Sequence, residues 1–184
     1  MDYLEKYARQ RLKDELHKIH TRYSSVLPEL TDVEKAVIHW YSENGYESLN
    51  EKLRDSKGKN MPPLGEFLNL ALSKLPNHED IVFRGMRYYK SRVEKYQTAF
   101  DKKEPVIEYS FTSTSTSDRV ARMFGNGIFL EIFSKTGKNI DNVTKYGLTS
   151  GQNEKEVLFK SSTPFYVIDI QHSNQYAHII LQEV

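Results

Sequence analysis

The chain of 184 residues contains no cysteine. Disulfide bonds, thiolate metal sites and cysteine nucleophiles are therefore excluded, and folding cannot depend on an oxidising compartment. The six histidines form no motif such as His-Glu-x-x-His, so we expect no metal site. The serines lie in no Gly-x-Ser-x-Gly motif, which argues against a serine nucleophile. The chemistry must then come from carboxylates, hydroxyls, arginines or histidines.

The sequence also lacks an apolar run near the roughly 18 residues that a membrane-spanning helix needs. It begins with a charged amphipathic stretch at residues 1–6 that has no apolar signal-peptide segment. We therefore expect a soluble protein made in the cytosol, with no membrane partner. With 26 basic and 25 acidic residues, the net charge of +1 gives the whole chain little attraction to nucleic acid. The length suits one domain over residues 1–184.

Helical patterns fill residues 1–76. Apolar residues at helical spacing predict helices over residues 4–22, 31–45 and 64–75. Thr31 and Glu34 form a capping box at the start of the second helix, where a hydroxyl and a carboxylate satisfy free backbone amides. Gly45 is expected to end this helix, and Pro76 stops the third.

From residue 77 onward the pattern changes to short apolar runs, which predict strands. The strands are expected at residues 81–86, 106–111, 128–133, 157–160, 165–171 and 177–181. A short helix is expected at residues 118–124. The long loop expected at residues 134–153 is of a length that is more often functional than not. Helices that precede strands without regular alternation predict an α+β fold with mostly antiparallel sheets, divided into a helical part (1–76) and a β-rich part (77–184).

Three polar motifs lie at or near the ends of predicted strands. Arg84 and Gly85 are in the last part of an apolar strand, and the triplet Ser113-Thr114-Ser115 follows an aromatic one. Glu154 and Glu156 are two residues apart, and such residues on an extended segment point to the same side. Both carboxylates would then face a common site, provided that the other motifs converge on it.

The order Arg, Ser-Thr-Ser, Glu-x-Glu, together with the helical stretch at residues 30–54, resembles the arginine-specific mono-ADP-ribosyltransferases of the bacterial exotoxin type, such as iota toxin. The match runs from about residue 30 to the C-terminus. The resemblance implies N-terminal helices followed by a two-sheet, mostly antiparallel β core. It also implies a toxin or effector that transfers ADP-ribose from NAD to an acceptor, here an arginine of a target protein, and releases nicotinamide.

The two glutamates have different expected tasks. Cleavage of the bond between nicotinamide and ribose passes through an oxocarbenium-like state, and nicotinamide leaves as a neutral molecule without a general acid. The resemblance makes Glu156 the carboxylate that binds the ribose 2'-hydroxyl and stabilises the developing cation. Glu154 would orient and polarise the acceptor, because a protonated guanidinium is a poor nucleophile.

The resemblance assigns NAD binding to residues around the first two motifs. The planar guanidinium of Arg84 suits the NAD pyrophosphate or ribose hydroxyls, and Gly85 lets the backbone approach the nicotinamide amide. Phe124 resembles the aromatic that stacks on nicotinamide, although an aromatic near the end of a short helix is also commonly a core residue. Arg119 and Arg122 are candidate phosphate contacts.

The Ser-Thr-Ser triplet has a supporting task in the same resemblance. Ser113 would donate a hydrogen bond to Glu156 and fix its rotamer, which places it among the expected catalytic residues. Thr114 and Ser115 would support the strand and the wall of the NAD pocket.

One departure from iota-like enzymes concerns the choice of target. Those enzymes carry an aromatic just before Glu-x-Glu, where this chain has Gly151, and the nearest aromatic is Tyr146. The target protein therefore cannot be transferred from such relatives, although the NAD chemistry can. We expect the enzyme to act in the cytosol of the producing cell or of a target cell that it reaches through a partner system. A cognate antitoxin or immunity protein is a further expected partner.

Two alternatives for the acceptor follow from the sequence. Basic residues and tyrosines alternate over residues 84–96, as in surfaces that bind nucleic acid, so RNA or DNA is a second possible acceptor. The structural alternative for this stretch is a solvated helix. In a plain NAD glycohydrolase toxin, water would replace the acceptor. Glu154 argues against this interpretation, because hydrolysis needs no carboxylate directed at a guanidinium.

Overall fold

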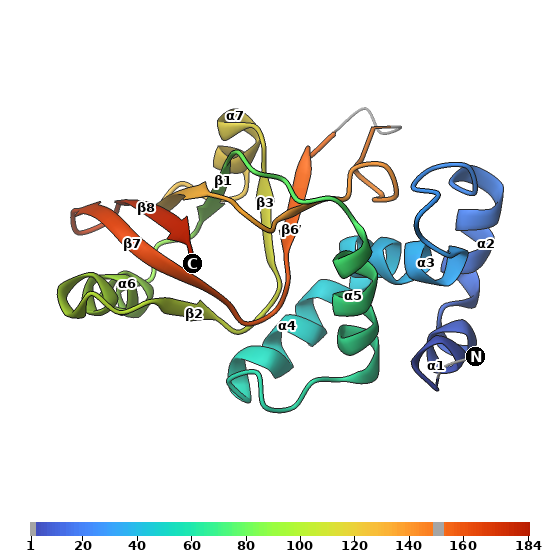
Figure 1. Cartoon of the computed structure of the whole chain (residues 1–184). Coiled ribbons are helices and arrows are strands. Elements are labelled where there is room, and N and C mark those ends of the chain that lie inside the picture. The colour runs from blue at the N-terminus through green and yellow to red at the C-terminus, as the bar shows by residue number, and fades with distance from the viewer. Residues whose placement is uncertain (1–2, 149–152) are drawn as a thin grey trace.

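The computed structural model describes residues 3–148 and 153–184. Helices gather at the N-terminal end of the molecule, and strands with two further helices make up the rest (Figure 1). The N-terminal helices are α1 (Tyr3–Arg11), α2 (Lys13–Arg22), α3 (Asp32–Trp40), η1 (Tyr41–Gly45), α4 (Tyr46–Asp55) and α5 (Pro63–Lys74). The predicted order of helices before strands is therefore confirmed.

The helix predicted over residues 4–22 is divided at Leu12. The backbone of Leu12 has φ −110° and ψ 41°, outside the helical region, and its side chain is buried. The bend between α1 and α2 lets α1 pack against α5 while α2 packs against α3. A straight helix could not reach both partners, so the prediction of one continuous helix was wrong.

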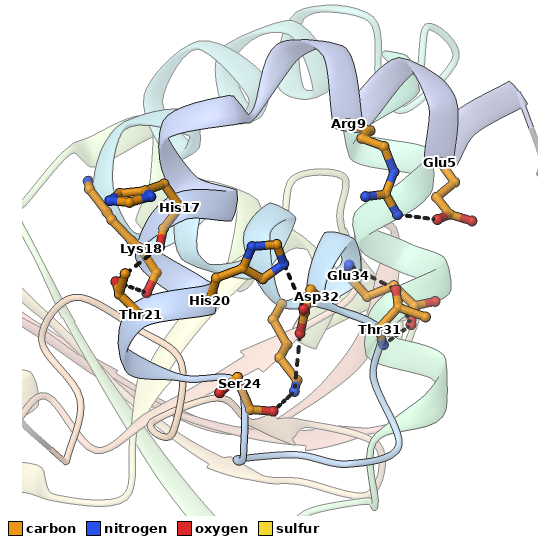
Figure 2. Close-up of polar contacts among 11 residues, drawn as sticks. Glu5, Arg9, His17, Lys18, His20, Thr21, Ser24, Thr31, Asp32 and Glu34 are labelled. Carbon is orange, nitrogen blue, oxygen red and sulfur yellow. Dashed lines mark hydrogen bonds and ion pairs between the residues drawn. The ribbon is translucent and has the colours of Figure 1, made fainter.

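The capping box predicted at the start of α3 is present (Figure 2). The Glu34 amide donates to the Thr31 hydroxyl at 3.3 Å, and the Thr31 amide donates to the Glu34 carboxylate at 2.8 Å. The same carboxylate lies 2.7 Å from the Lys74 ammonium of α5. The cap therefore also ties α3 to α5, in addition to satisfying the first free amides of α3.

Gly45 does not end the second predicted helix. The chain continues from α3 through the π-helical turn η1 directly into α4, and Gly45 itself has helical dihedral angles, φ −81° and ψ −25°. A Cβ on Gly45 would lie 2.5 Å from the Trp40 ring. Glycine is therefore needed at this position for packing against Trp40, and the expectation of a helix end was wrong.

Within the described residues, eight strands follow the order β2-β7-β8-β4-β1-β3-β6-β5. The strands are β1 (Ile81–Met86), β2 (Val106–Glu108), β3 (Thr112–Ser115), β4 (Ile128–Phe133), β5 (Lys138–Asn139), β6 (Glu156–Phe159), β7 (Thr163–His172) and β8 (Ala177–Glu183). Among the strand pairs of the described residues, only β4 and β8 run parallel, so the mostly antiparallel arrangement is confirmed.

Two sheets were expected, and the strands instead follow one continuous order. The two halves of this order meet between β1 and β3, which share the single register pair Phe83 and Ser115. Two further predictions were wrong in detail. The strand expected at residues 106–111 ends at Glu108, and β5 lies inside the region expected to be a loop, where it pairs with β6.

The register of β3 and β6 decides which side chains face the helices. Ser115 is the partner of Glu156, and Ser113 is the partner of Leu158. Side chains of directly opposite residues lie on the same face of a sheet. Leu158 packs in the apolar cluster formed with α1 to α5, so Ser113 and Glu156 also face the helical layer.

The other two helices lie on the sheet. Helix α6 (Lys90–Lys102) packs against β7, and α7 (Asp118–Met123) packs against β1. The short helix expected at residues 118–124 is thus confirmed. Across residues 3–148 and 153–184, no helix is both long and apolar enough to cross a membrane.

We expect Thr31→Ala to lower the free energy of unfolding by about 1 kcal/mol, because the Glu34 amide loses its acceptor. Thr21→Ala is the matched control. The Thr21 hydroxyl only donates to helix carbonyls, so its loss should cost less than about 0.5 kcal/mol. Urea unfolding of both variants measures the difference. Equal losses would contradict a stabilising role for the cap.

Candidate active site

A cavity of about 630 Å³ lies between η1, α4 and the strands β1, β3 and β6. Its lining combines aromatic rings, hydroxyls and carboxylates with one arginine. The lining residues are Tyr41, Ser42, Glu43, Tyr46, Asn50, Phe83, Arg84, Gly85, Met86, Ser113, Thr114, Ser115, Ala121, Phe124, Tyr146, Glu154 and Glu156. The eight residues that the sequence assigns to catalysis and NAD binding all lie in this cavity, whereas the candidate phosphate contacts Arg119 and Arg122 do not.

Arg84 is fixed to the neighbouring strand by its own side chain. It is half-buried on β1, and its Nη1 donates to the main-chain carbonyl of Ser113 at 2.5 Å. This bond holds the guanidinium against β3, while the cavity leaves the group open to a ligand. Arg84 therefore provides a cation of fixed position near the Glu156 carboxylate of β6.

Glu156 is a buried carboxylate with only 5% of its surface exposed. Burial raises the pKa of Glu156 to about 7, while a hydrogen bond from the Ser113 side chain opposes the shift. The charges of Glu154 and Asp141 raise the pKa further, and Arg84 lowers it. The carboxylate is thus held in a desolvated position that is costly for its charged form.

Asp141 fixes the main chain of Glu156. The Glu156 amide donates to Asp141 Oδ1, and the Asp141 amide donates to Asn139 Oδ1 at 3.0 Å. Burial raises the pKa of Asp141. The sequence did not point to Asp141, because this residue lies in the long loop expected at residues 134–153 and belongs to none of the three motifs.

The two glutamates share the cavity, although not for the expected reason. Lys155 between them has φ +49°, in the left-handed region, so the segment is not a regular strand before Glu156. Main-chain contacts hold this turn. The Glu154 amide donates to the Tyr146 carbonyl at 2.8 Å, and the Thr116 amide donates to the Lys155 carbonyl at 3.0 Å. Burial, followed by the Asp141 charge, raises the pKa of Glu154.

The hydroxyls of the triplet connect β3 to the segment that carries the glutamates. Thr114 Oγ1 donates to the Val157 carbonyl at 2.7 Å, and Ser115 Oγ donates to the Glu154 carbonyl at 2.7 Å. Both hydroxyls therefore supplement the main-chain pairing of β3 and β6. Gly151, the position that iota-like enzymes give to an aromatic, lies outside the described residues.

Gly85 is a glycine for a structural reason. A Cβ on Gly85 would lie 2.2 Å from the Ala121 carbonyl oxygen and 2.8 Å from that of Gly125. The end of α7 is thus packed directly on the β1 backbone beside Arg84. Any side chain at position 85 would push α7 away from the cavity.

Phe124 follows α7 and is 58% exposed, so it is not a core residue. Its ring lines the cavity, where it is available for contact with a ligand. Arg122 instead stacks on Phe129, with its guanidinium carbon 3.8 Å from the ring centroid. Neither Arg119 nor Arg122 is among the described residues that line the cavity.

Tyr41 and Asn50 line the cavity from the helical layer and were not found from the sequence. Asn50 Nδ2 donates to the Tyr41 hydroxyl at 2.9 Å, while the Phe111 amide donates to Asn50 Oδ1 at 3.1 Å. Burial raises the pKa of Tyr41 far above its usual range. Tyr41 and Tyr46 both line the cavity, and their separation of five residues was the available signal for Tyr41. The hydrogen bonds of a π-helical turn join residues five apart, but the helix end expected at Gly45 hid this relation.

The carboxylates and hydroxyls of the lining can bind a cationic or polar substrate. Among residues 3–148 and 153–184, no group of three His, Asp or Glu side chains is arranged to hold a metal ion. Carboxylates, hydroxyls and one guanidinium remain as the chemical groups of the cavity. This set suits acid–base and electrostatic chemistry.

Residues 3–184 match the family model of the NAD:arginine ADP-ribosyltransferases. The chain is 31% identical over 152 residues to the putative NAD(+)--arginine ADP-ribosyltransferase Mav of Mycobacterium avium, covering 81% of this chain and 17% of Mav. It is also 31% identical over 160 residues to the NAD(+)--protein-arginine ADP-ribosyltransferase Tre1 of Pseudomonas putida, covering 84% of this chain and 30% of Tre1. The chain thus spans less than a third of the length of either relative.

Solved structures share the fold. Exoenzyme S of Pseudomonas aeruginosa, determined with human 14-3-3 protein beta and carba-NAD, superposes with a TM-score of 0.78 at 22% identity, covering 98% of this chain and 87% of that chain. The structure of the ADP-ribosyltransferase Vis of Vibrio splendidus was determined with agmatine. It superposes with a TM-score of 0.64 at 22% identity, covering 97% and 85% of the two chains.

The raised pKa of Glu156 predicts a pH-dependent stability. The folded state favours the protonated form of Glu156. The contribution of this group to the free energy of unfolding is therefore fully present below the ordinary glutamate pKa, and it is lost as the pH rises through about 7. Glu156→Gln should therefore raise the free energy of unfolding by about 1–3 kcal/mol at pH 8 and by much less at pH 5. Calorimetry at both pH values measures this, with the exposed Glu94→Gln as control. A gain independent of pH would contradict burial of the charge as its cause.

Proposed function

The chain belongs to the NAD:arginine ADP-ribosyltransferase family, and we propose on that basis that it transfers ADP-ribose from NAD to arginine side chains of a target protein. The observation that supports this most is the meeting of Arg84, Ser113, Glu154 and Glu156 in one cavity. These residues come from three separate segments of the chain. Residues 1–184 would form one catalytic unit, in which the helices close the cavity over the sheet.

In the proposed reaction, the bond between ribose C1' and the nicotinamide nitrogen breaks, and its electron pair leaves with neutral nicotinamide. Positive charge then develops on the ribose. Glu156 would accept a hydrogen bond from the 2'-hydroxyl and stabilise this charge as the carboxylate. Its burial supports the role, because an anion in a desolvated site interacts more strongly with a nearby cation than an exposed one does.

NAD binding is proposed for the groups around β1. Arg84 would bind the pyrophosphate or ribose hydroxyls through its planar fork, which its bond to the Ser113 carbonyl keeps in one orientation. The Gly85 main chain would contact the nicotinamide amide. Phe124 would stack on the nicotinamide ring, since its exposed ring lines the cavity.

The Ser113 side chain is proposed to hold Glu156 in the reactive rotamer. Its hydrogen bond favours the ionised carboxylate against the effect of burial. Thr114 and Ser115 would maintain the wall by tying β3 to the segment of Glu154 and Glu156. The triplet would therefore act by positioning the reactive carboxylates.

Glu154 is proposed to orient the acceptor guanidinium and take the proton that it loses as its nitrogen attacks C1'. Tyr46, Tyr146 and Glu154 line the same cavity. Aromatic faces beside a carboxylate suit a guanidinium, which stacks and donates at once. The Vis structure with agmatine, itself a guanidinium compound, supports the same class of acceptor.

The basic residues of α6 support a nucleic-acid acceptor less well than the sequence pattern did. Lys90 lies 3.6 Å from Glu94, and Lys95 lies 2.8 Å from Glu108. Arg92 lies over the Tyr89 ring. Three of the basic side chains thus have partners within the chain itself, so we favour a protein arginine over RNA or DNA.

We propose a toxin or effector that acts in the cytosol of a target cell or of the producing cell. An antitoxin or immunity protein would protect the producer, because the substrate NAD is present in every cytosol. Among the described residues, Tyr146 is the aromatic nearest to Glu154 in the preceding segment and would contact the target.

Substitution of each glutamate tests the proposed reaction. Glu156→Gln should abolish both transfer to agmatine and NAD hydrolysis, because the developing cation loses its counter-charge. Glu154→Gln should abolish transfer yet leave measurable hydrolysis. Both products are quantified in one assay with labelled NAD, with Glu94→Gln as an exposed control. Equal loss of both activities in Glu154→Gln would rule out separate tasks for the two glutamates. Labelling of purified RNA or DNA, with no labelling of arginine, would show that the acceptor is a nucleic acid.

Arg84→Lys tests the NAD site. The substitution keeps the charge but removes the planar fork, so NAD binding should weaken by about 1–3 kcal/mol. Arg122→Lys is the matched control, because Arg122 stacks on Phe129 outside the cavity. Calorimetric titration with NAD measures both affinities. Unchanged binding in Arg84→Lys would remove Arg84 from the NAD site.

A further inference from the structure

We propose that Glu43 is a positioning residue that clamps the segment 141–148 onto η1 and thereby holds Glu154 in place for the acceptor. This inference rests on the proposed function of Glu154 as the group that orients the guanidinium. It concerns a residue outside the three motifs, on the helical side of the cavity.

Glu43 contacts two lysines and a histidine from separate parts of the chain. Its Oε2 lies 2.6 Å from Lys18 Nζ of α2 and 3.7 Å from His39 Nε2 of α3. Its Oε1 lies 3.4 Å from Lys145 Nζ of the 141–148 segment. One carboxylate therefore bridges two N-terminal helices and a segment that follows them by about a hundred residues.

The charge on Glu43 is well stabilised. The hydrogen bond from Lys18 lowers the pKa of Glu43 against the effect of burial, and contacts with Lys145 and His39 lower it further. The Glu43 side chain is only 13% exposed, whereas that of Lys145 is 45% exposed. The Lys18 side chain is 39% exposed, so dissolved salt can screen the contacts of Glu43 with both lysines.

Two other contacts attach the segment near the same place. The Lys145 amide donates to Ser42 Oγ at 3.5 Å, and His39 Nδ1 donates to the Val143 carbonyl at 2.8 Å. The Val143 side chain is buried in the helical core cluster. Val143 anchors the first half of the segment independently of charge, so Glu43 controls the second half around Lys145.

That second half carries the contact with Glu154. The Tyr146 carbonyl, next to Lys145, accepts the Glu154 amide at 2.8 Å. Glu156 is held differently. It lies in β6 and pairs with Ser115 of β3, and its amide bonds to Asp141 in the half of the segment that Val143 anchors. Release of Lys145 should therefore displace Glu154 and leave Glu156 in place. The physical consequence is a selective loss of acceptor orientation.

Glu43→Gln tests this inference, with Glu51→Gln on the exposed surface of α4 as the matched control. The ratio of agmatine modification to NAD hydrolysis should fall about three- to tenfold in Glu43→Gln, on the scale of a partly buried ion pair, with an unchanged KM for NAD. Lys145→Met should lower the ratio in the same way, and the double variant should lose no more than either alone. Added salt should lower the ratio in the wild type and not in Glu43→Gln.

Hydrogen exchange gives a readout that does not depend on activity. The amides of Leu148 and Glu154, which bond to Asp141 and Tyr146, should exchange faster in Glu43→Gln, while amides of β6 should not. Unchanged exchange, an unchanged ratio, or parallel loss of both activities would overturn the clamp. A wild type that cleaves no NAD would instead refute the proposed function, which the exchange experiment does not use.

Discussion

The burial of one carboxylate is the constraint on which the rest of the site depends. Glu156 lies beneath the helical layer, where its charged form is disfavoured and its pKa rises to about 7. Ser113 and Arg84 stabilise the charged form, whereas Asp141 fixes the main chain of Glu156 while its own charge raises the pKa further. Removing Ser113 or Arg84 would leave a desolvated charge with fewer partners, which explains why separate segments must meet at this point.

The helical layer has a direct part in this arrangement. Helices α3, η1 and α4 cover the face of β3 and β6 that carries Ser113 and Glu156, and they contribute Tyr41, Asn50 and Glu43 to the cavity. The Asn50 side chain joins this layer to the Phe111 main chain. The position of the carboxylates therefore depends on packing between two parts of the chain that look independent in sequence.

Short runs of mostly apolar residues allowed β1 and β4 to be predicted with correct limits, because a strand covered on both faces needs apolar residues at most positions. The capping box likewise predicted the start of α3 from residues close in sequence. The errors at Leu12 and Gly45 have the opposite origin. In both places the local pattern was overridden by contacts with distant residues or by packing on Trp40, which no local rule contains.

The sequence by itself determined the chemical groups of the site: one arginine on an apolar strand, a hydroxyl triplet and two glutamates in a fixed order. Only the tertiary structure decided how they meet. The left-handed turn at Lys155 replaced the expected extended segment, and Asp141 entered the site from a region without a pattern. The physical reason is that residue type is local, whereas burial, pKa and approach to a partner depend on neighbours far away in the chain.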